Sequence, residues 1–424
     1  MGQARLRGQE TPAEPEPPGP GPLRIAMIGA RGVPANYSGV EQAVESLGAA
    51  LVQRGHQVTV FCRREPGQAR PLEYRGMRLR YLAAARWPGV ATFVHAALST
   101  VCALRGYDVI HYNALGPNLF SPLARLLSRA HVVTTVHGRD DQRAKWGRVA
   151  KRLLKAGAYI SARVPHTTIV VSEDLQRGYA SEFGRRTALL LNSLDPVTPE
   201  PGGRQLRELG VSPGGYVIYI GRLVAEKSID TLLTAYRALP TSLPFLIVAE
   251  LDPGDEYICG LLKRAEDDPR VRLIGARYGH SLAELFTNAA LYVTASTLEG
   301  MPFALSEALQ YGVPVVASDI GPHRDLLGGE GPGRRLVPVG DALAMARVMD
   351  EVLNDQETAG RDVSARATVI SHVFSPARAA ELAERIYRGA LPSNGHLTGA
   401  TVTAGSLESG RAARSASRLQ ESVS

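Results

Sequence analysis

Short apolar runs alternate with longer amphipathic segments along most of the 424-residue chain. Such runs are typical of buried strands in a parallel sheet, with helices in the gaps between them. In the first half, the runs that predict strands are 24–29, 57–61, 77–82, 109–111, 132–137, 168–172 and 188–191. In the second half they are 216–220, 245–249, 271–274, 291–295, 314–317 and 335–337. The pattern predicts an α/β protein with two Rossmann-like, doubly wound domains that face each other across a cleft.

Composition indicates where these domains begin and end. Residues 1–22 are rich in proline and residues 391–424 in serine, glycine, alanine and threonine, so both segments are expected to be disordered. A stretch rich in proline and glycine at 196–208 predicts a linker. The remaining units are then a first domain at 23–195, a second domain at 209–374, and a C-terminal helix at 375–390 that packs back toward the first domain.

The composition is that of a soluble globular protein, with 44% hydrophobic and 21% charged residues. Cys62, Cys102 and Cys259 lie far apart, which fits neither a disulfide framework nor a metal site and suits a reducing cytosol. The net charge of +7 permits anionic partners, but no nucleic-acid-binding motif occurs, so nucleic acid is not expected. Residues 1–22 contain no apolar signal segment, which predicts a cytoplasmic protein. Proline, glycine and histidine interrupt the apolar run 87–104, which predicts a buried helix rather than a membrane span.

Residues 289–318 combine two apolar strands with a polar loop and a helix between them. The loop carries Glu299 and Gly300, and Pro302 pre-sets the backbone for a helix that includes Glu307. In parallel sheets, ligands bind where such loops leave the carboxyl ends of strands, and free amides at a helix start suit an anion. Two glutamates eight residues apart are most often surface residues. Here they flank a helix start between two buried strands, which favours a ligand-binding role.

Two loops of the first domain are also expected to face the cleft. The glycine-rich loop after strand 24–29 includes Gly39, where the backbone can approach a ligand closely. This loop lacks the Gly-x-Gly-x-x-Gly fingerprint, so a nicotinamide cofactor is not expected. His137 ends strand 132–137 and precedes Gly138, which favours a place at the cleft, although a strand-end histidine is commonly only structural.

Glu299 and Glu307 in this setting resemble the paired-glutamate signature of retaining glycosyltransferases of family GT4, which have the two-domain GT-B architecture. The segment Gly221–Lys227 is similar to the Gly-Arg-Leu…Glu-Lys segment of that family. The resemblance covers about 23–390. Four further segments resemble the bacterial rhamnosyltransferase-like branch: 29–41, 137–147, 277–284 and 316–320.

The resemblance implies a hexosyltransferase that moves a sugar from a nucleotide-diphosphate donor to a glycan or lipid-linked glycan, with retention, in polysaccharide biosynthesis. It implies that Glu299 lies near the donor sugar hydroxyls and Glu307 at the nucleotide ribose. Arg222 and Lys227, which on spacing alone could be ordinary surface cations, would stabilise charge on the departing diphosphate. The chain contains no Asp-x-Asp pair and its histidines lack metal-ligand spacing, so neither a metal nor a cofactor is expected.

The expected site residues fall into three groups. The catalytic group is His137, Arg222, Lys227 and Glu299. The donor-binding group is Gly39, Gly221, Arg222, Lys227, Glu299, Gly300, Met301, Pro302, Phe303, Ala304 and Glu307. The acceptor-side group is Tyr37, Ser38, Asn113, Arg139 and Lys145.

The chain departs from the rhamnosyltransferase-like branch at three places. Ser38–Gln42 stands where Gly-Gly-Phe-Glu-Thr is usual, Asn113 where a second histidine is usual, and Glu299–Phe303 where Glu-Gly-Thr-Ser-Pro is usual. These changes lie near the expected sugar and acceptor pockets, so they leave the sugar open. Two alternatives to a transferase also remain: a sugar-nucleotide epimerase or hydrolase of the same fold, and a non-catalytic scaffold protein that binds a nucleotide sugar.

The segment 143–163 contains seven basic residues and no acidic one. Its apolar residues recur at helical spacing, which predicts an amphipathic helix with a cationic face. Such a face is either simply solvated or holds anionic lipid headgroups. The second interpretation would place the protein peripherally on the inner face of a membrane.

Overall fold

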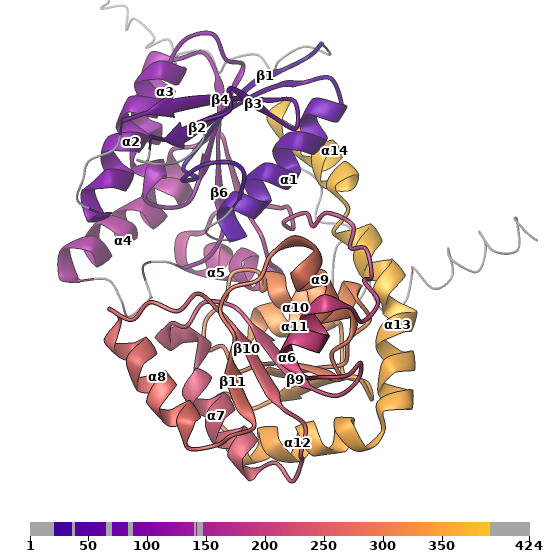
Figure 1. Cartoon of the computed structure of the whole chain (residues 1–424). Coiled ribbons are helices and arrows are strands. Elements are labelled where there is room, and N and C mark those ends of the chain that lie inside the picture. Colours follow the sequence, from indigo (N-terminus) through magenta and orange to yellow (C-terminus); the bar gives the residue numbers. More distant parts are fainter. Residues whose placement is uncertain are drawn as a thin grey trace, which may run out of the picture.

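The computed structural model describes residues 21–35, 39–64, 70–83, 88–139, 141 and 147–390. The chain forms two α/β domains, and the C-terminal helices return along their common side (Figure 1). Apolar clusters lie on both faces of each sheet, beneath the helices that cover them. The predicted pair of Rossmann-like, doubly wound domains is confirmed.

The described strands of the first domain form one sheet in the order β3-β4-β2-β1-β5-β6-β7-β8. All neighbouring strands are parallel except the edge pair β3 and β4, and the two-residue strand β3 was not predicted. Met27 and Ile28 of β1 pack into different apolar clusters, because successive side chains point to opposite faces. The strands are β1 (Arg24–Ile28), β2 (Gln57–Arg63), β3 (Glu73–Tyr74), β4 (Met77–Leu82), β5 (Val109–Asn113), β6 (His131–Val136), β7 (Thr167–Val170) and β8 (Ala188–Leu189).

The described strands of the second domain form an all-parallel sheet in the order β11-β10-β9-β12-β13-β14. Each lies within two residues of an apolar run in the sequence, because strands covered on both faces are apolar throughout. The strands are β9 (Val217–Ile220), β10 (Phe245–Val248), β11 (Val271–Leu273), β12 (Leu291–Thr294), β13 (Val315–Ser318) and β14 (Arg334–Val337).

Helices connect most of these strands. The first domain contains α1 (Gly39–Gln53), α2 (Pro88–Ala103), the 3-10 helix η1 (Pro117–Phe120), α3 (Ser121–Leu127), α4 (Arg148–Arg163) and α5 (Glu173–Phe183). The rest of the chain contains α6 (Arg204–Leu209), the 3-10 helix η3 (Ala225–Lys227), α7 (Ile229–Ala238), α8 (Glu256–Glu266), α9 (Gly279–Thr287), α10 (Phe303–Gln310), α11 (Gly321–Leu327), α12 (Ala342–Asn354), α13 (Gln356–Val373) and α14 (Pro376–Tyr387).

Two chain crossings join the domains and lie side by side. The backbone N–H of Leu194 in the first crossing donates to the carbonyl of Phe374 in the second, at 2.9 Å. Beyond the second crossing, α14 packs on α1, and the Tyr387 hydroxyl hydrogen-bonds the buried His111 ring at 2.8 Å. The C-terminal helix is therefore part of the first domain's core.

The expected linker at 196–208 was partly wrong, because α6 begins within it at Arg204. The start of this helix is stabilised by the carboxylate of Glu284, which is 78 or more residues away from the amides that it binds, so the local sequence could not indicate it. Glu284 accepts hydrogen bonds from the backbone N–H groups of Gly203, at 2.7 Å, and Leu206, at 3.0 Å. It thereby satisfies amides that a helix start otherwise leaves unpaired.

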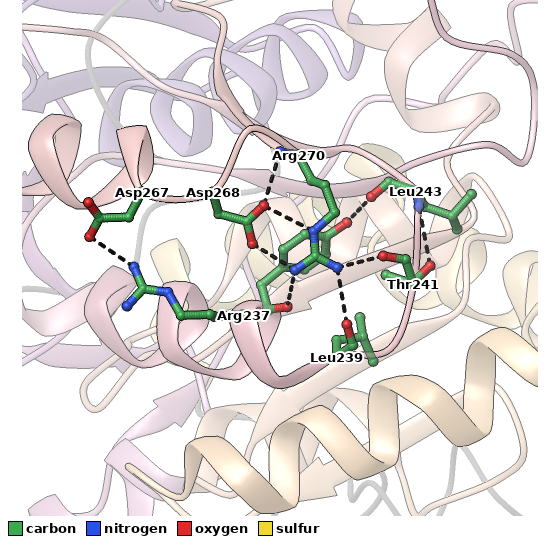
Figure 2. Close-up of polar contacts among 8 residues, drawn as sticks. Arg237, Leu239, Thr241, Leu243, Asp267, Asp268 and Arg270 are labelled. Atoms are coloured by element: carbon green, nitrogen blue, oxygen red, sulfur yellow. Dashed lines mark hydrogen bonds and ion pairs between the residues drawn. The ribbon is translucent and has the colours of Figure 1, made fainter.

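A dense charged cluster in the second domain stabilises the fold outside the cavity lining. The Arg270 guanidinium donates to the Asp268 carboxylate at 2.7 and 3.0 Å and to the carbonyls of Leu239 and Thr241 (Figure 2). It also stacks on the Tyr236 ring, 5.0 Å from its centroid. These contacts fasten the end of α7 to the start of edge strand β11, away from the cleft.

No helix among the described residues is long and apolar enough to cross a membrane. The expectation of a buried helix over 87–104 was nevertheless only half right. Ala96 and Ala103 of α2 are fully buried, but Val94, Leu98 and Val101 are exposed. The helix therefore has an apolar face on the core and a second apolar face on the surface.

Candidate functional site

The two sheets turn their carboxyl-end loops toward one cavity of about 640 Å³ between the domains. In the second sheet the strand order reverses between β9 and β12, and the loops after these strands line the cavity. Ligands in open α/β sheets bind at such reversal points. The volume falls in the range of roughly 300–1,000 Å³ that small-molecule sites occupy. The cavity is therefore the candidate active site.

Strand β9 delivers the expected cations directly into the cavity. Gly221 and Arg222 follow the strand, and Lys227 ends the short helix η3; all three line the cavity. The Arg222 side chain is exposed, and its guanidinium makes no ion pair with any residue that the structure describes. An unpaired cation at the carboxyl end of a central strand is suited to an anionic ligand.

Glu299 and Lys227 form a salt bridge at the base of the cavity. The Ser296 hydroxyl donates to the same carboxylate at 2.7 Å, and only 9% of the Glu299 side chain is exposed. Burial alone would raise the pKa of Glu299, but the Lys227 ammonium and the Ser296 hydroxyl hold it below its usual value. These contacts therefore favour the ionised form of the Glu299 carboxylate.

The start of α10 forms the next part of the wall. Phe303 and Ala304 begin the helix and line the cavity, while Pro302 precedes it in an extended conformation. Met301 also lines the cavity but packs mainly into the apolar core beneath it. The unpaired amides of this first turn therefore lie at the cavity.

Glu307, one turn further along α10, reaches the first domain. Its carboxylate accepts a hydrogen bond of 3.2 Å from the Gln42 side chain on α1. Burial raises the pKa of Glu307 to about 7, and the Gln42 amide offsets only part of that effect. Burial thus favours the protonated form of this carboxyl up to a higher pH than for an exposed glutamate.

The raised pKa of Glu307 predicts a pH-dependent stability difference. The folded value of about 7 lies above the unfolded value of about 4.3, so this group favours folding below the lower value and loses that contribution as the pH rises through the upper one. Glu307→Gln should therefore nearly match wild type near pH 4.5 and be more stable near pH 8, by up to about 3–4 kcal/mol. Thermal unfolding at both pH values measures this, with Glu266→Gln on the exposed face of α8 as the control. An equal difference at both pH values would contradict it.

His137 forms the opposite wall, at the end of β6 in the first domain. Both ring nitrogens are buried, and neither has a hydrogen-bond partner among the described residues. Burial lowers the pKa of His137 to about 4, although the nearby Asn192 opposes the shift, so the imidazole is neutral. Buried polar atoms without partners cost about 1–3 kcal/mol.

Two glycines allow the walls to approach each other. A Cβ atom on Gly300 would lie 1.6 Å from the His137 carbonyl oxygen, and one on Gly39 would lie 2.6 Å from the Phe303 ring. Only glycine fits at either position. Gly29 and Gly32 of the same loop instead face Asn113 and Cys62, so of these three loop glycines Gly39 is the one that lines the cleft.

The expected acceptor-side residues have mixed positions. Asn113 is buried on β5 and shares a small cavity with His137 behind the main one. Arg139 does not line the main cavity in the part of the chain that is described, because its guanidinium pairs with Asp141, at 2.9 Å, and Glu182. Tyr37, Ser38 and Lys145 lie outside the described residues.

Several cavity residues were missed from the sequence. Gln42, Glu45, Asn192 and Asp195 come from the first domain, and the pair Arg277–Tyr278 from the second. The sequence did point to two of the segments that supply them, because Gln42 ends the departing stretch 38–42 and Arg277 begins the similar run 277–284. The others carry no local pattern, since α1 and the first crossing contribute them singly. Among the described residues no group of three or more histidine, cysteine, aspartate or glutamate side chains could hold a metal ion.

The two sheets face one cleft, with cations after β9 and paired glutamates after β12. Two such domains are the architecture of GT-B glycosyltransferases, and two glycosyltransferase family models match the chain. The family model Glycosyltransferase Family 4 matches residues 37–196, and Glycosyl transferases group 1 matches residues 208–367. The chain is a glycosyltransferase of the GT4 type, one model covering each domain.

Curated relatives and solved structures agree with this assignment. Phosphatidyl-myo-inositol mannosyltransferase of Mycolicibacterium smegmatis is 27% identical over 79% of this chain and 86% of its own length. Sucrose-phosphate synthase from Thermosynechococcus elongatus superimposes with a TM-score of 0.74 at 23% identity, covering 86% of this chain and 98% of that one. HepE of Anabaena, in complex with UDP and glucose, gives 0.72 at 19% identity over 86% and 99% of the two chains. At these identities the solved structures show the shared fold.

Proposed function

We propose that the protein is a retaining, metal-independent glycosyltransferase that moves a hexosyl group from a nucleotide-diphosphate sugar to a glycan or lipid-linked glycan. The main support for the proposal is that one cavity brings together Arg222, the Lys227–Glu299 pair, the start of α10 and Glu307. The nucleotide and sugar lie on the second domain, and the acceptor enters from the first. The solved relatives named for complexes with UDP-glucose and with ADP support a nucleotide-sugar donor.

The transfer breaks the bond between the anomeric carbon and the oxygen of the terminal donor phosphate. The acceptor oxygen bonds to the same face of that carbon, and its proton passes to the departing diphosphate. Negative charge grows on the phosphate oxygens through an ion-paired, oxocarbenium-like transition state. Arg222, Lys227 and the first amides of α10 stabilise that charge, which is the role a metal ion has in other glycosyltransferases. His137, neutral and unpaired, orients and polarises the reacting sugar from the opposite wall.

The acceptor and the site of action are the finer parts of the proposal. One relative is named for mannosyl transfer to phosphatidyl-myo-inositol, which supports a lipid-linked acceptor. Such an acceptor places the enzyme in the cytoplasm, peripherally at the inner face of a membrane, in polysaccharide biosynthesis. The likeness to the rhamnosyltransferase-like branch leaves rhamnose among the sugars to test. An epimerase or hydrolase would consume the donor without an acceptor, and a scaffold protein would bind it without turnover.

The two glutamates should separate binding from chemistry. Glu307→Ala should weaken binding of the nucleoside diphosphate by about 1–3 kcal/mol, because a charged hydrogen bond to the ribose is lost. Glu299→Ala should mainly lower kcat, because it removes a contact to the sugar, which the nucleoside diphosphate lacks. Calorimetry with UDP, GDP, ADP and dTDP identifies the nucleotide and measures both variants. Wild-type nucleotide affinity in Glu307→Ala would refute the ribose placement.

A further inference from the structure

Exposed apolar side chains are concentrated on one side of the first domain. Among the described residues, nine of thirteen large, exposed apolar side chains lie on α2, α3 and α4. The nine are Val90, Val94, Leu98, Val101, Leu126, Leu127, Val149, Leu153 and Tyr159. Single exposed apolar residues are ordinary, but a group on adjacent helices marks an interaction surface. We call the exposed faces of these three helices the lateral surface.

The three helices form one continuous side of the domain. The 3-10 helix η1 contacts all of them, α2 contacts α3, and Figure 1 shows them stacked along the outer edge of the first domain. On α2 the four exposed residues recur at intervals of three or four, so they form a single stripe. Leu126 at the end of α3 is 82% exposed and Val149 at the start of α4 is 71% exposed. These side chains have no partner surface within the described chain.

The charged side chains of the lateral surface are all basic. None of the three helix sequences contains aspartate or glutamate. Helix α4 carries the cations Arg148, Lys151, Arg152, Lys155 and Arg163, interspersed with its exposed apolar residues. Protein interfaces place few lysines among their apolar contacts, whereas an interfacial membrane helix combines both kinds of side chain.

Helix α4 is held rigidly in place while it presents this face. Leu154 and Ala158 pack into the core on its inner side. The Asn118 amide donates to the Gly157 carbonyl at 3.2 Å, and a Cβ atom on Gly157 would lie only 2.4 Å from the Leu115 carbonyl oxygen. The exposed cations and apolar side chains therefore belong to a preformed surface rather than to a helix that must fold on binding.

We propose that the lateral surface docks on an anionic phospholipid bilayer, with the apolar side chains entering the headgroup region and the α4 cations contacting lipid phosphates. Charge complementarity favours an anionic bilayer over other partners. Anionic headgroups attract the α4 cations, and the three helices carry no acidic side chain that would repel them. The interaction itself does not depend on which sugar is transferred. Only the purpose of membrane binding rests on the proposed function. That purpose is to bring a lipid-linked acceptor to the cleft, and α4 follows the His137 loop in the chain.

The test is sedimentation of the full chain with phosphatidylcholine vesicles, with and without phosphatidylglycerol. Wild type should sediment with the anionic vesicles only, and salt should release it, since exposed charges are screened over about 10 Å at 0.1 M. The triple variant Lys151→Gln/Arg152→Gln/Lys155→Gln should bind on the order of 100-fold more weakly, from about one headgroup contact per cation. The apolar variant Leu98→Gln/Val101→Gln should also bind more weakly while its salt dependence is unchanged.

A matched control removes three exposed cations of the second domain: Arg207→Gln/Lys263→Gln/Arg347→Gln should sediment as wild type does. Circular dichroism should show that every variant is folded. Failure of wild type to sediment with anionic vesicles at low salt would overturn the proposal, as would undiminished binding of the α4 variant. Self-association of wild type that Leu98→Gln/Val101→Gln abolishes, without vesicle binding, would assign the surface to a second copy of the chain. Because the vesicle assay needs no donor, its failure leaves the proposed transferase intact.

Discussion

Arg222→Ala should lower kcat by about 100-fold or more, the loss expected when one preorganised charge contact to a transition state is removed. The residue is exposed and its guanidinium pairs with no described residue, so its removal should leave the thermal unfolding temperature unchanged. Steady-state assays with the best donor measure the effect. Lys263→Ala, an exposed cation on α8 outside the cavity, is the matched control and should retain full activity.

Lys227→Ala should combine a similar loss of kcat with a loss of stability. Its ammonium is the cation paired with Glu299, and removing one member of a buried pair leaves the other charge uncompensated. The double variant Lys227→Ala/Glu299→Gln should recover stability but not activity. If either variant, Arg222→Ala or Lys227→Ala, has activity close to that of wild type, the cation that it lacks does not stabilise the transition state.

Gly300→Ala should lower kcat by about 100-fold by another route. The added methyl would lie 1.6 Å from the His137 carbonyl oxygen, so the two cleft walls must separate by about 1.5 Å or more to relieve the clash. Displacements of that size between reacting groups are enough for such a loss. The substitution changes the distance between the two cleft walls and removes no functional group. Nucleotide binding to the second domain should therefore be largely retained.

Gly260→Ala is the matched control for this substitution. It lies within α8, where an added methyl meets no other atom within 4 Å. Replacing glycine there should stabilise the protein by about 0.4–1 kcal/mol and leave kcat unchanged. A Gly300→Ala enzyme with wild-type kcat would mean that Glu299 and His137 need not approach each other during turnover.

The sequence predicted which second-domain residues line the cavity because they belong to local strand–loop–helix units. Glu299, Pro302 and Glu307 belong to one strand–loop–helix unit, and Arg222 and Lys227 follow directly from one apolar run. In a parallel sheet the carboxyl ends of such strands share one edge, so the spacing along the chain converts directly into a position at the cleft.

Contacts between distant segments could not be predicted in this way. The Gln42–Glu307 hydrogen bond joins residues 265 positions apart, and neither residue's neighbours indicate it. Arg139 was expected on the acceptor side, but Glu182 on α5 and Asp141 hold its guanidinium in ion pairs. The outer face of α2 was predicted to be buried but is exposed. Composition shows how apolar a helix is, but it does not show which faces of that helix other elements cover.

The most direct test of the proposed function is a screen of nucleotide-diphosphate sugars that records nucleoside diphosphate release with and without glycan and lipid-linked glycan acceptors. A metal-independent transferase should release one nucleoside diphosphate only when a suitable acceptor is present. It should do so equally in EDTA, and the sugar should be joined to the acceptor with the donor's anomeric configuration. Turnover of the donor alone, abolition by EDTA with rescue by Mn²⁺, or no release from any donor would contradict the proposal.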